Sequence, residues 1–187
     1  SAALSMSTHS ASNSFRSEAD FCGSTMNWSP LTILPTEWRR PRPFAARLAL
    51  ALSSAIEAKA HYTQGQTERV TDYSSIIAIE LKVMGKIPRS EKNLFENLRI
   101  SSLLHDIGKI GVPEKILNKA GFLNEEERKE MNNHPLIGAH ILGKIDEFHE
   151  PILGVKYHHE RYDGSGYPEG LKAETIPLIA QIISVAD

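Results

Sequence analysis

Two clusters of polar residues interrupt apolar sequence in this chain, and their residue types could bind a metal ion. The first is His105-Asp106-Ile107-Gly108-Lys109, and the second runs from His158-His159-Glu160 to Gly166-Tyr167-Pro168. Burying imidazole and carboxylate side chains is costly unless a partner compensates them. A bound metal ion would supply that compensation, and a metal ion beside a lysine suggests hydrolysis of a phosphate ester.

Residues outside these clusters complete a possible set of ligands. His134 stands at the start of an expected helix, and Asp187 falls on the same helix face as Ile183, four residues earlier. Imidazole nitrogens and carboxylate oxygens suit iron, manganese or zinc. Six such groups are enough for two ions that share a bridge, and we prefer this hypothesis to a metal-free core cluster. The candidate ligands are His105, Asp106, His134, His158, His159 and Asp187.

A cation and a glycine-containing loop are expected beside these ligands. Lys109, three residues after Asp106, should point into the same cleft and face a bound phosphate. In the loop, Arg161 could clamp a phosphate and Tyr167 could stack on a base, while glycines let the backbone approach closely. A surface lysine and a plain turn are the alternatives. The candidate substrate-binding residues are Lys109, Arg161, Gly166, Tyr167 and Pro168.

The elements that position these residues are predicted to be helices, because apolar residues recur at steps of three and four without a strand pattern. The expected fold is all-α, a compact bundle of six or seven helices. In a helix expected to begin at Pro135, the inward-facing residues are predicted to include Ile145 and Phe148. Helices are expected at 44–60, 66–84 (inward face Val70, Tyr73, Ile77, Leu81 and Met84), 92–106 and 125–132 (capped by Asn124 and Glu127), and from Pro135, Pro151 and Pro177, with a loop at 161–176.

The two ends of the chain differ from its middle. Residues 1–43 are rich in serine and proline and include a basic stretch, Arg39-Arg40-Pro41-Arg42-Pro43, so we expect a disordered segment or linker. Residues 44–187 form the predicted domain. The apolar pattern before Asp187 is that of a helix interior, which predicts that the domain is truncated at its C-terminal end.

Composition narrows the class of protein. Of the 187 residues, 41% are hydrophobic and 24% charged, as in ordinary globular proteins. A net charge of −2 argues against a nucleic-acid polymer as partner, and no apolar run is long enough to span a membrane. The single cysteine, Cys22, cannot form an internal disulfide, which favours a cytoplasmic location.

Together the motifs resemble the HD-GYP family of the metal-dependent HD phosphohydrolase superfamily. The resemblance covers residues 45–187 and rests on His105 to Lys109, His134-Pro135, His158-His159, Gly166-Tyr167-Pro168 and Ala186-Asp187 in this order. It implies an HD-superfamily helical bundle and a bacterial phosphodiesterase that hydrolyses cyclic di-GMP to pGpG and GMP. It also implies an iron or manganese centre held by the six candidate ligands, with Asp106 and Lys109 as catalytic residues. Family members commonly follow receiver or sensory domains, and their Gly-Tyr-Pro loop is linked to diguanylate cyclase (GGDEF) domains.

Three residues depart from the family pattern. Gln66 replaces the histidine of a Gly-His-x-x-Arg-Val motif, and an amide oxygen is a poorer ligand for these ions. Ala60 replaces an aspartate, and Tyr62 replaces the glutamate of three-metal members, so we expect two ions. Two alternatives follow: a degenerate domain that binds nucleotides or proteins without turnover, or a hydrolase of another cyclic dinucleotide such as cyclic GMP-AMP.

Overall fold

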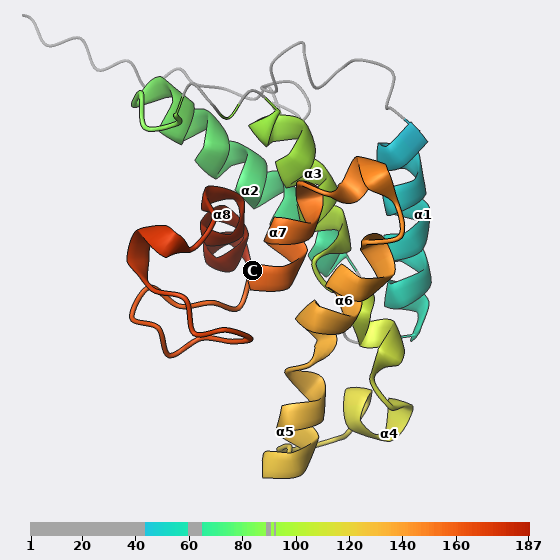
Figure 1. Cartoon of the computed structure of the whole chain (residues 1–187). Coiled ribbons are helices and arrows are strands. Elements are labelled where there is room, and N and C mark those ends of the chain that lie inside the picture. The colour runs from blue at the N-terminus through green and yellow to red at the C-terminus, as the bar shows by residue number, and fades with distance from the viewer. Residues whose placement is uncertain (1–43, 60–64, 89–90, 92) are drawn as a thin grey trace, which may run out of the picture. The chain divides into compact units, whose positions relative to one another are not determined.

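The computed structural model of the chain describes residues 44–59, 65–88, 91 and 93–187 (Figure 1). No β-strand occurs in these ranges, which confirms the all-α prediction. The predictions for residues 1–43 and for Ala60 and Tyr62 lie outside the described residues. The helices are α1 (Phe44–Lys59), α2 (Gln66–Val83), α3 (Leu94–Leu104), α4 (Glu114–Leu117), α5 (Glu125–Met131), α6 (His134–Leu142), α7 (Pro151–Tyr157) and α8 (Leu178–Ala186), with 3-10 helices η3 (Ile107–Gly111), η4 (Asp146–Phe148) and η5 (Ala173–Thr175).

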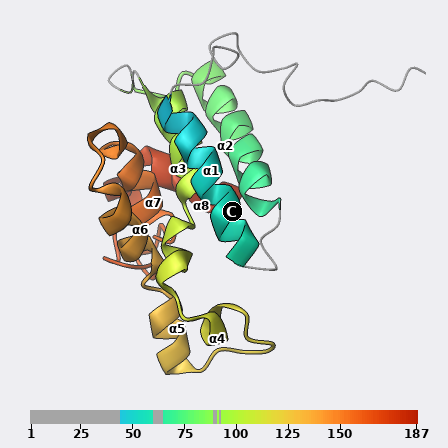
Figure 2. The same ribbon diagram turned by 90° about the vertical axis from the view of Figure 1, so that its right-hand side faces the viewer.

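Helix α3 is the centre of the packing. It contacts α1, α2, α7 and α8, and Figures 1 and 2 show it running between its neighbours. Its residues Leu103 and Leu104 join an apolar cluster with α1 and α7, while Leu94 and Leu98 join a second cluster with α2 and α8. Burying each leucine side chain contributes about 1.5–3 kcal/mol. Both clusters therefore fix α3, whose C-terminal end carries the first polar cluster.

The predicted inward face of α2 is confirmed in part, because Ile77 and Leu81 pack against the second apolar cluster. Tyr73 and Met84 were expected to face inward, but both are exposed. Val70 is buried as predicted. Small side chains fill most of the buried face, because they allow neighbouring helices to approach closely and their hydroxyls can bond the carbonyl four residues earlier. The buried residues of α2 are Thr67, Val70, Thr71, Ser74, Ser75 and Ala78.

Most predicted helix starts are confirmed, whereas one predicted helix ends early. The side chain of Asn124 accepts from the Glu127 N–H, and the Glu127 side chain accepts from the Asn124 N–H, so α5 begins with a capping box. Helix α6 ends at Leu142, and Ile145 and Phe148 lie beyond it. Phe148 is nevertheless fully buried, because the chain turns back through η4. The short α4 and the 3-10 helices were not predicted.

The 3-10 helix η3 is fixed from two sides. Lys59, at the end of α1, donates from Nζ to the carbonyls of Ile110 (2.7 Å) and Val112 (3.1 Å). On the other side η3 packs against α6, and a Cβ atom built on Gly108 would lie 1.8 Å from the His134 carbonyl oxygen. This close approach brings the first polar cluster to the start of α6. None of the described helices is both long and apolar enough to cross a membrane.

We expect Gly108→Ala to destabilise the fold by about 3 kcal/mol or more, because the new methyl group would collide with backbone atoms that cannot move aside. Gly111→Ala is the matched control, since its nearest neighbour at 3.0 Å is the flexible side chain of Ile137. Urea unfolding of both variants measures the difference. Equal loss of stability would contradict the proposed tight contact between η3 and α6.

Candidate metal centre

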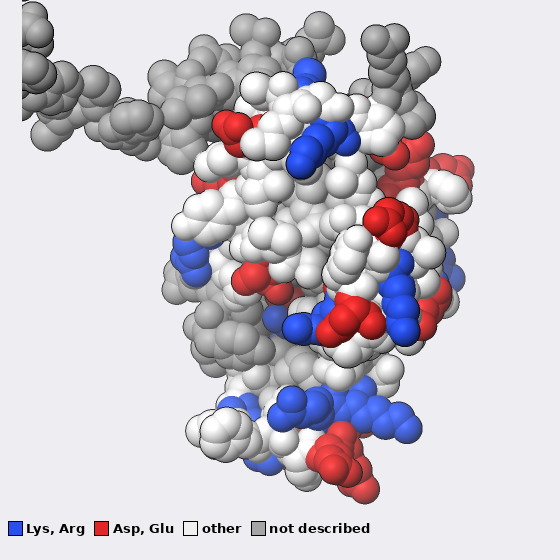
Figure 3. Space-filling view, turned by 90° about the vertical axis from the view of Figure 1, so that its left-hand side faces the viewer, with Lys and Arg blue, Asp and Glu red and all other residues white. Residues whose placement is uncertain are grey.

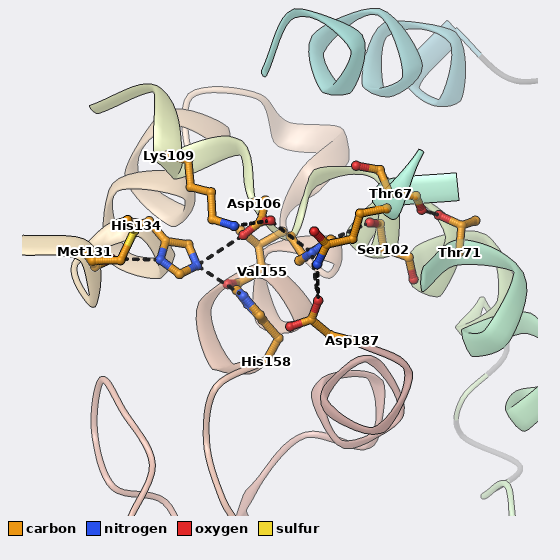
Figure 4. A network of polar contacts seen from close by, with 12 residues as sticks. Thr67, Thr71, Ser102, Asp106, Lys109, Met131, His134, Val155, His158 and Asp187 are labelled. Carbon is orange, nitrogen blue, oxygen red and sulfur yellow. Dashed lines mark hydrogen bonds and ion pairs between the residues drawn. The ribbon is translucent and has the colours of Figure 1, made fainter. Parts of the chain in front are cut away.

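The first polar cluster lies where a helix changes type. Helix α3 ends at Leu104, His105 follows as its C-terminal residue, and Asp106 precedes η3. This end allows both neighbouring side chains to face one centre. Lys109 lies on the same side, with its Nζ 2.6 Å from Asp106 Oδ2 (Figure 4).

Three buried histidines are oriented in the same way. The Nδ1 atom of each contacts the backbone carbonyl three residues earlier, so Nδ1 carries a proton and, in the neutral imidazole, Nε2 keeps its lone pair. A hydrogen bond from Nδ1 to a carbonyl is typical of histidines that bind a metal ion through Nε2. The contacts are His105 Nδ1–Ser102 O (2.7 Å), His134 Nδ1–Met131 O (2.9 Å) and His158 Nδ1–Val155 O (2.8 Å).

The three Nε2 atoms point into the centre, where a positive partner would satisfy the lone pairs of the neutral imidazoles. The Nε2 atoms of His134 and His158 are 3.3 Å apart, so two lone pairs face each other unless a cation or proton lies between them. Nε2 of His105 is buried and has no hydrogen-bond partner among the described residues. Metal ions in this centre would satisfy these nitrogens, so the donor set fits this kind of group.

The ligand atoms fall into two adjoining groups. One nitrogen from each of His134, His158 and His159 lies within 4.8 Å of the others. In the second group, His105 Nε2 lies 3.4 Å from Asp106 Oδ2 and 3.6 Å from Asp187 Oδ1. Asp106 joins the groups, because its other oxygen is 3.4 Å from His134 Nε2. The structure thus brings all six predicted ligands together.

The first group holds its histidines neutral. Burial lowers the pKa of His134, His158 and His159, and the neighbouring imidazoles lower that of His158 further. The pKa of His159 falls to about 4. Neutral imidazoles are the form that binds a metal ion, so little proton competition is expected at neutral pH.

The second group is negatively charged and attracts a cation. Burial lowers the pKa of His105, but the carboxylates of Asp106 and Asp187 outweigh this effect and raise it to about 10. The contact with His105 lowers the pKa of Asp187 to about 2. Burial works against ionisation of Asp106, yet the neighbouring cationic groups hold its pKa well below the usual range. In the metal-free protein His105 is therefore protonated, and its positive charge faces the carboxylates of Asp106 and Asp187.

Gln66 reaches this group without being a histidine. Its Nε2 donates to Asp187 Oδ1 at 3.0 Å. The contact joins the first residue of α2 to the residue that follows α8. An amide nitrogen that donates to a carboxylate is not a metal ligand. The contact therefore orients Asp187 instead of adding a ligand to the set.

The loop between α7 and α8 covers part of the cluster. The Tyr167 ring stacks on the His159 ring at 4.7 Å, and the Tyr167 N–H donates to the His159 carbonyl. Burial and the charges of Asp106 and Asp187 raise the pKa of Tyr167 to about 12, so its phenol stays neutral. Arg161 instead is 69% exposed, and its Nε atom lies 3.9 Å from an Asp163 oxygen.

A family model described as "HD domain" matches residues 51–187. The chain belongs to the HD domain family. The resemblance seen in the sequence motifs is therefore supported by a match over most of the chain, and the helical fold of the described residues agrees with it.

Curated relatives of this HD domain are named as phosphodiesterases of cyclic dinucleotides. A cyclic di-GMP phosphodiesterase of Thermotoga maritima is 44% identical over 67% of this chain and 33% of its own length. The cyclic di-GMP phosphodiesterase response regulator RpfG of Xanthomonas campestris is 39% identical over 73% and 35%. A 3'3'-cGAMP-specific phosphodiesterase 3 of Vibrio cholerae is 37% identical over 75% and 29%. The chain thus spans about a third of the length of these relatives.

Sequence reasoning missed two residues that support the centre. Lys59 holds the end of η3, as described above, and no motif marks it. Glu160 was part of the second cluster but was given no role, although it is a buried carboxylate. A charged residue directly after two candidate ligands was the available signal. His140 and His149, which are not among the candidate ligands, are exposed.

On the face that carries the loop between α7 and α8, the surface charges are of both signs. In Figure 3, basic and acidic side chains are interspersed over this face. Inside the site, Lys109 supplies a positive charge beside Asp106, and bound metal ions would add to it.

We expect the free energy of unfolding of the chelator-treated HD domain to fall as the pH rises from 6.5 to about 10. The pKa of His105 is raised from 6.5 to about 10, so within this window the folded state binds a proton that the unfolded state has released. The stabilisation is complete below pH 6.5 and is lost as the pH passes the folded-state pKa. Urea unfolding at both ends of the window measures it.

His105→Gln should remove this decline with pH, because it deletes the titrating group. His140→Gln is the matched control, since His140 is an exposed histidine of the same domain. If both variants kept the slope of the unmodified chain, the proton would not reside on His105.

Proposed function

We propose that this HD domain is a metal-dependent phosphodiesterase that hydrolyses cyclic di-GMP to pGpG and GMP. The observation that carries the proposal is the convergence of histidine Nε2 atoms and two carboxylates beside Lys109. The names of the relatives in Thermotoga maritima and Xanthomonas campestris support the substrate. Neutral imidazoles, carboxylates and a lysine are the groups that metal-assisted hydrolysis of a phosphate ester requires.

The proposed cofactors are two divalent ions, iron or manganese. His134, His158 and His159 would hold one, His105 and Asp187 would hold the other, and Asp106, whose two oxygens face the two groups, would contribute to the centre. Bound ions would supply a hydroxide nucleophile at neutral pH and polarise a phosphoryl oxygen. Nitrogen and oxygen ligands of this kind suit iron and manganese.

The chain's own side chains would bind and orient the phosphodiester. Lys109, held by Asp106 at the edge of the centre, would place its positive charge against the phosphate as charge develops there. Tyr167, stacked on His159, would form a wall of the pocket together with Gly166 and Pro168. No serine or cysteine nucleophile is needed in this scheme.

A second substrate is favoured by one relative. The Vibrio cholerae protein named as specific for 3'3'-cGAMP is 37% identical to this HD domain. Cyclic GMP-AMP has the same phosphodiester ring as cyclic di-GMP and differs in one base. A hydrolysis assay should therefore offer both cyclic dinucleotides under the same conditions, and the ratio of kcat/KM values decides between them.

The proposed setting follows from the same substrate class. We place the reaction in the cytoplasm, which agrees with a chain that has one cysteine. The Gly-Tyr-Pro loop, whose Tyr162 and Arg161 are exposed, would be the contact surface for a diguanylate cyclase (GGDEF) domain. A receiver or sensory domain would precede the linker; the Xanthomonas relative is named as a response regulator.

We expect Asp106→Asn to abolish hydrolysis and to lower the metal content measured by elemental analysis of anaerobically purified protein. The substitution removes the charge that faces both ligand groups. Asp146→Asn, on an exposed aspartate of η4, should leave both quantities unchanged. Retained turnover in Asp106→Asn would contradict the metal mechanism, and an inactive unmodified chain with full metal content would favour the binding-module alternative.

We expect Gln66→His to raise the metal content and the rate of hydrolysis, because an imidazole would replace an amide that only donates to Asp187. Glu68→His is the matched control, since it adds a histidine to the exposed side of the same helix. If the unmodified chain already holds two ions and Gln66→His changes nothing, Gln66 does not impair the site and the degenerate alternative fails.

A further inference from the structure

A buried carboxylate outside the ligand set holds the main chain of the loop between α7 and α8. Glu160 is only 2% exposed. Its Oε1 accepts from the N–H groups of Glu169 (2.7 Å) and Gly170 (3.1 Å), and its Oε2 accepts from that of Leu171 (2.9 Å). Three consecutive N–H groups thus point at one side chain, which satisfies both of its oxygens.

Glu160 is adjacent in the sequence to a candidate metal ligand. Glu160 follows His159, and the rings of His159 and Tyr167 are stacked. The loop therefore contacts the end of α7 twice: through Tyr167 on His159, and through residues 169–171 on Glu160. A Cβ atom on Gly166 would lie 2.5 Å from the Glu160 Cα atom, so the backbones approach closely here.

A nearby ion pair is a weaker restraint on the same segment. Lys156 Nζ lies 2.6 Å from a carboxylate oxygen of Glu169, but the Glu169 side chain is 45% exposed. Exposed pairs of this kind contribute little, because water and salt screen them. Hydrogen bonds from backbone N–H groups to a buried carboxylate are stronger, so Glu160 dominates the placement of residues 169–171.

We propose that Glu160 is a positioning residue that holds the Gly-Tyr-Pro loop over the metal centre and thereby sets the affinity for the phosphodiester substrate. Its effect on affinity rests on the proposed function, whereas its effect on the loop does not. Glu160 acts through Tyr167 and the backbone, without contact to the reacting atoms. Loosening the loop should therefore raise KM and leave kcat largely unchanged.

The decisive variant is Glu160→Gln, which keeps the size of the side chain but turns one acceptor into a donor that faces backbone N–H groups. Glu174→Gln is the matched control, because it makes the same change at a carboxylate of the same loop whose contact is the exposed Tyr162 hydroxyl. Glu160→Asp is the second variant, which keeps the charge and withdraws the carboxylate by one methylene group. It replaces Glu160→Gln if that protein fails to fold.

Hydrogen exchange of the metal-free protein tests the loop without any substrate. In Glu160→Gln the amides of residues 169–171 should exchange about tenfold faster or more, since hydrogen bonds to charged acceptors typically contribute more than this factor. Exchange in α3 and α8 should stay as in the unmodified chain. Unchanged exchange at residues 169–171, or a rise spread over all helices, would overturn the proposal.

Steady-state kinetics and elemental analysis test the consequence for the site. In the variant, KM for cyclic di-GMP should rise about tenfold with kcat within about twofold, and metal content should match that of Glu174→Gln. A loss of kcat or of metal with KM unchanged would overturn the positioning role. If the unmodified chain hydrolyses no cyclic dinucleotide, the proposed function fails while the exchange result still decides the loop.

Discussion

Three contacts between a histidine Nδ1 atom and a backbone carbonyl control the rest of the site. Each directs an Nε2 atom at one centre, and the neutral nitrogens of His134 and His158 come within 3.3 Å of each other. Lone pairs at this distance repel unless a cation separates them. The fold must therefore hold them there, and a cation is the natural occupant of the space between them.

The packing of α3 provides this restraint on the histidines. Apolar clusters on either side of the helix fix it against α1 and α7 and against α2 and α8. The polar residues follow where apolar packing stops: His105 at the end of α3, His134 at the start of α6 and His158 after α7. Helix ends suit ligands, because a change of backbone direction lets neighbouring side chains such as His105 and Asp106 converge.

The sequence predicted the convergence of the candidate ligands better than the buried faces of the helices. His, Asp and proline positions carry specific chemistry, so the convergence of residues such as His134 and Asp187 could be anticipated. The burial of α2 could not, because Tyr73 and Met84 fit an apolar period while threonines and serines fill the close contacts instead. Glu160 escaped prediction since its partners are backbone N–H groups, which no sequence pattern identifies.

Gln66 shows how a residue that is not a metal ligand can support the site. Asp187 needs a partner for the oxygen that His105 approaches at 3.6 Å, and the Gln66 amide donates to that oxygen at 3.0 Å. A carboxamide thus keeps Asp187 oriented across the gap between α2 and α8, which pack directly together. The amide does not supply an imidazole nitrogen as a metal ligand. Gln66 therefore supports the geometry of the second ligand group without adding a ligand to it.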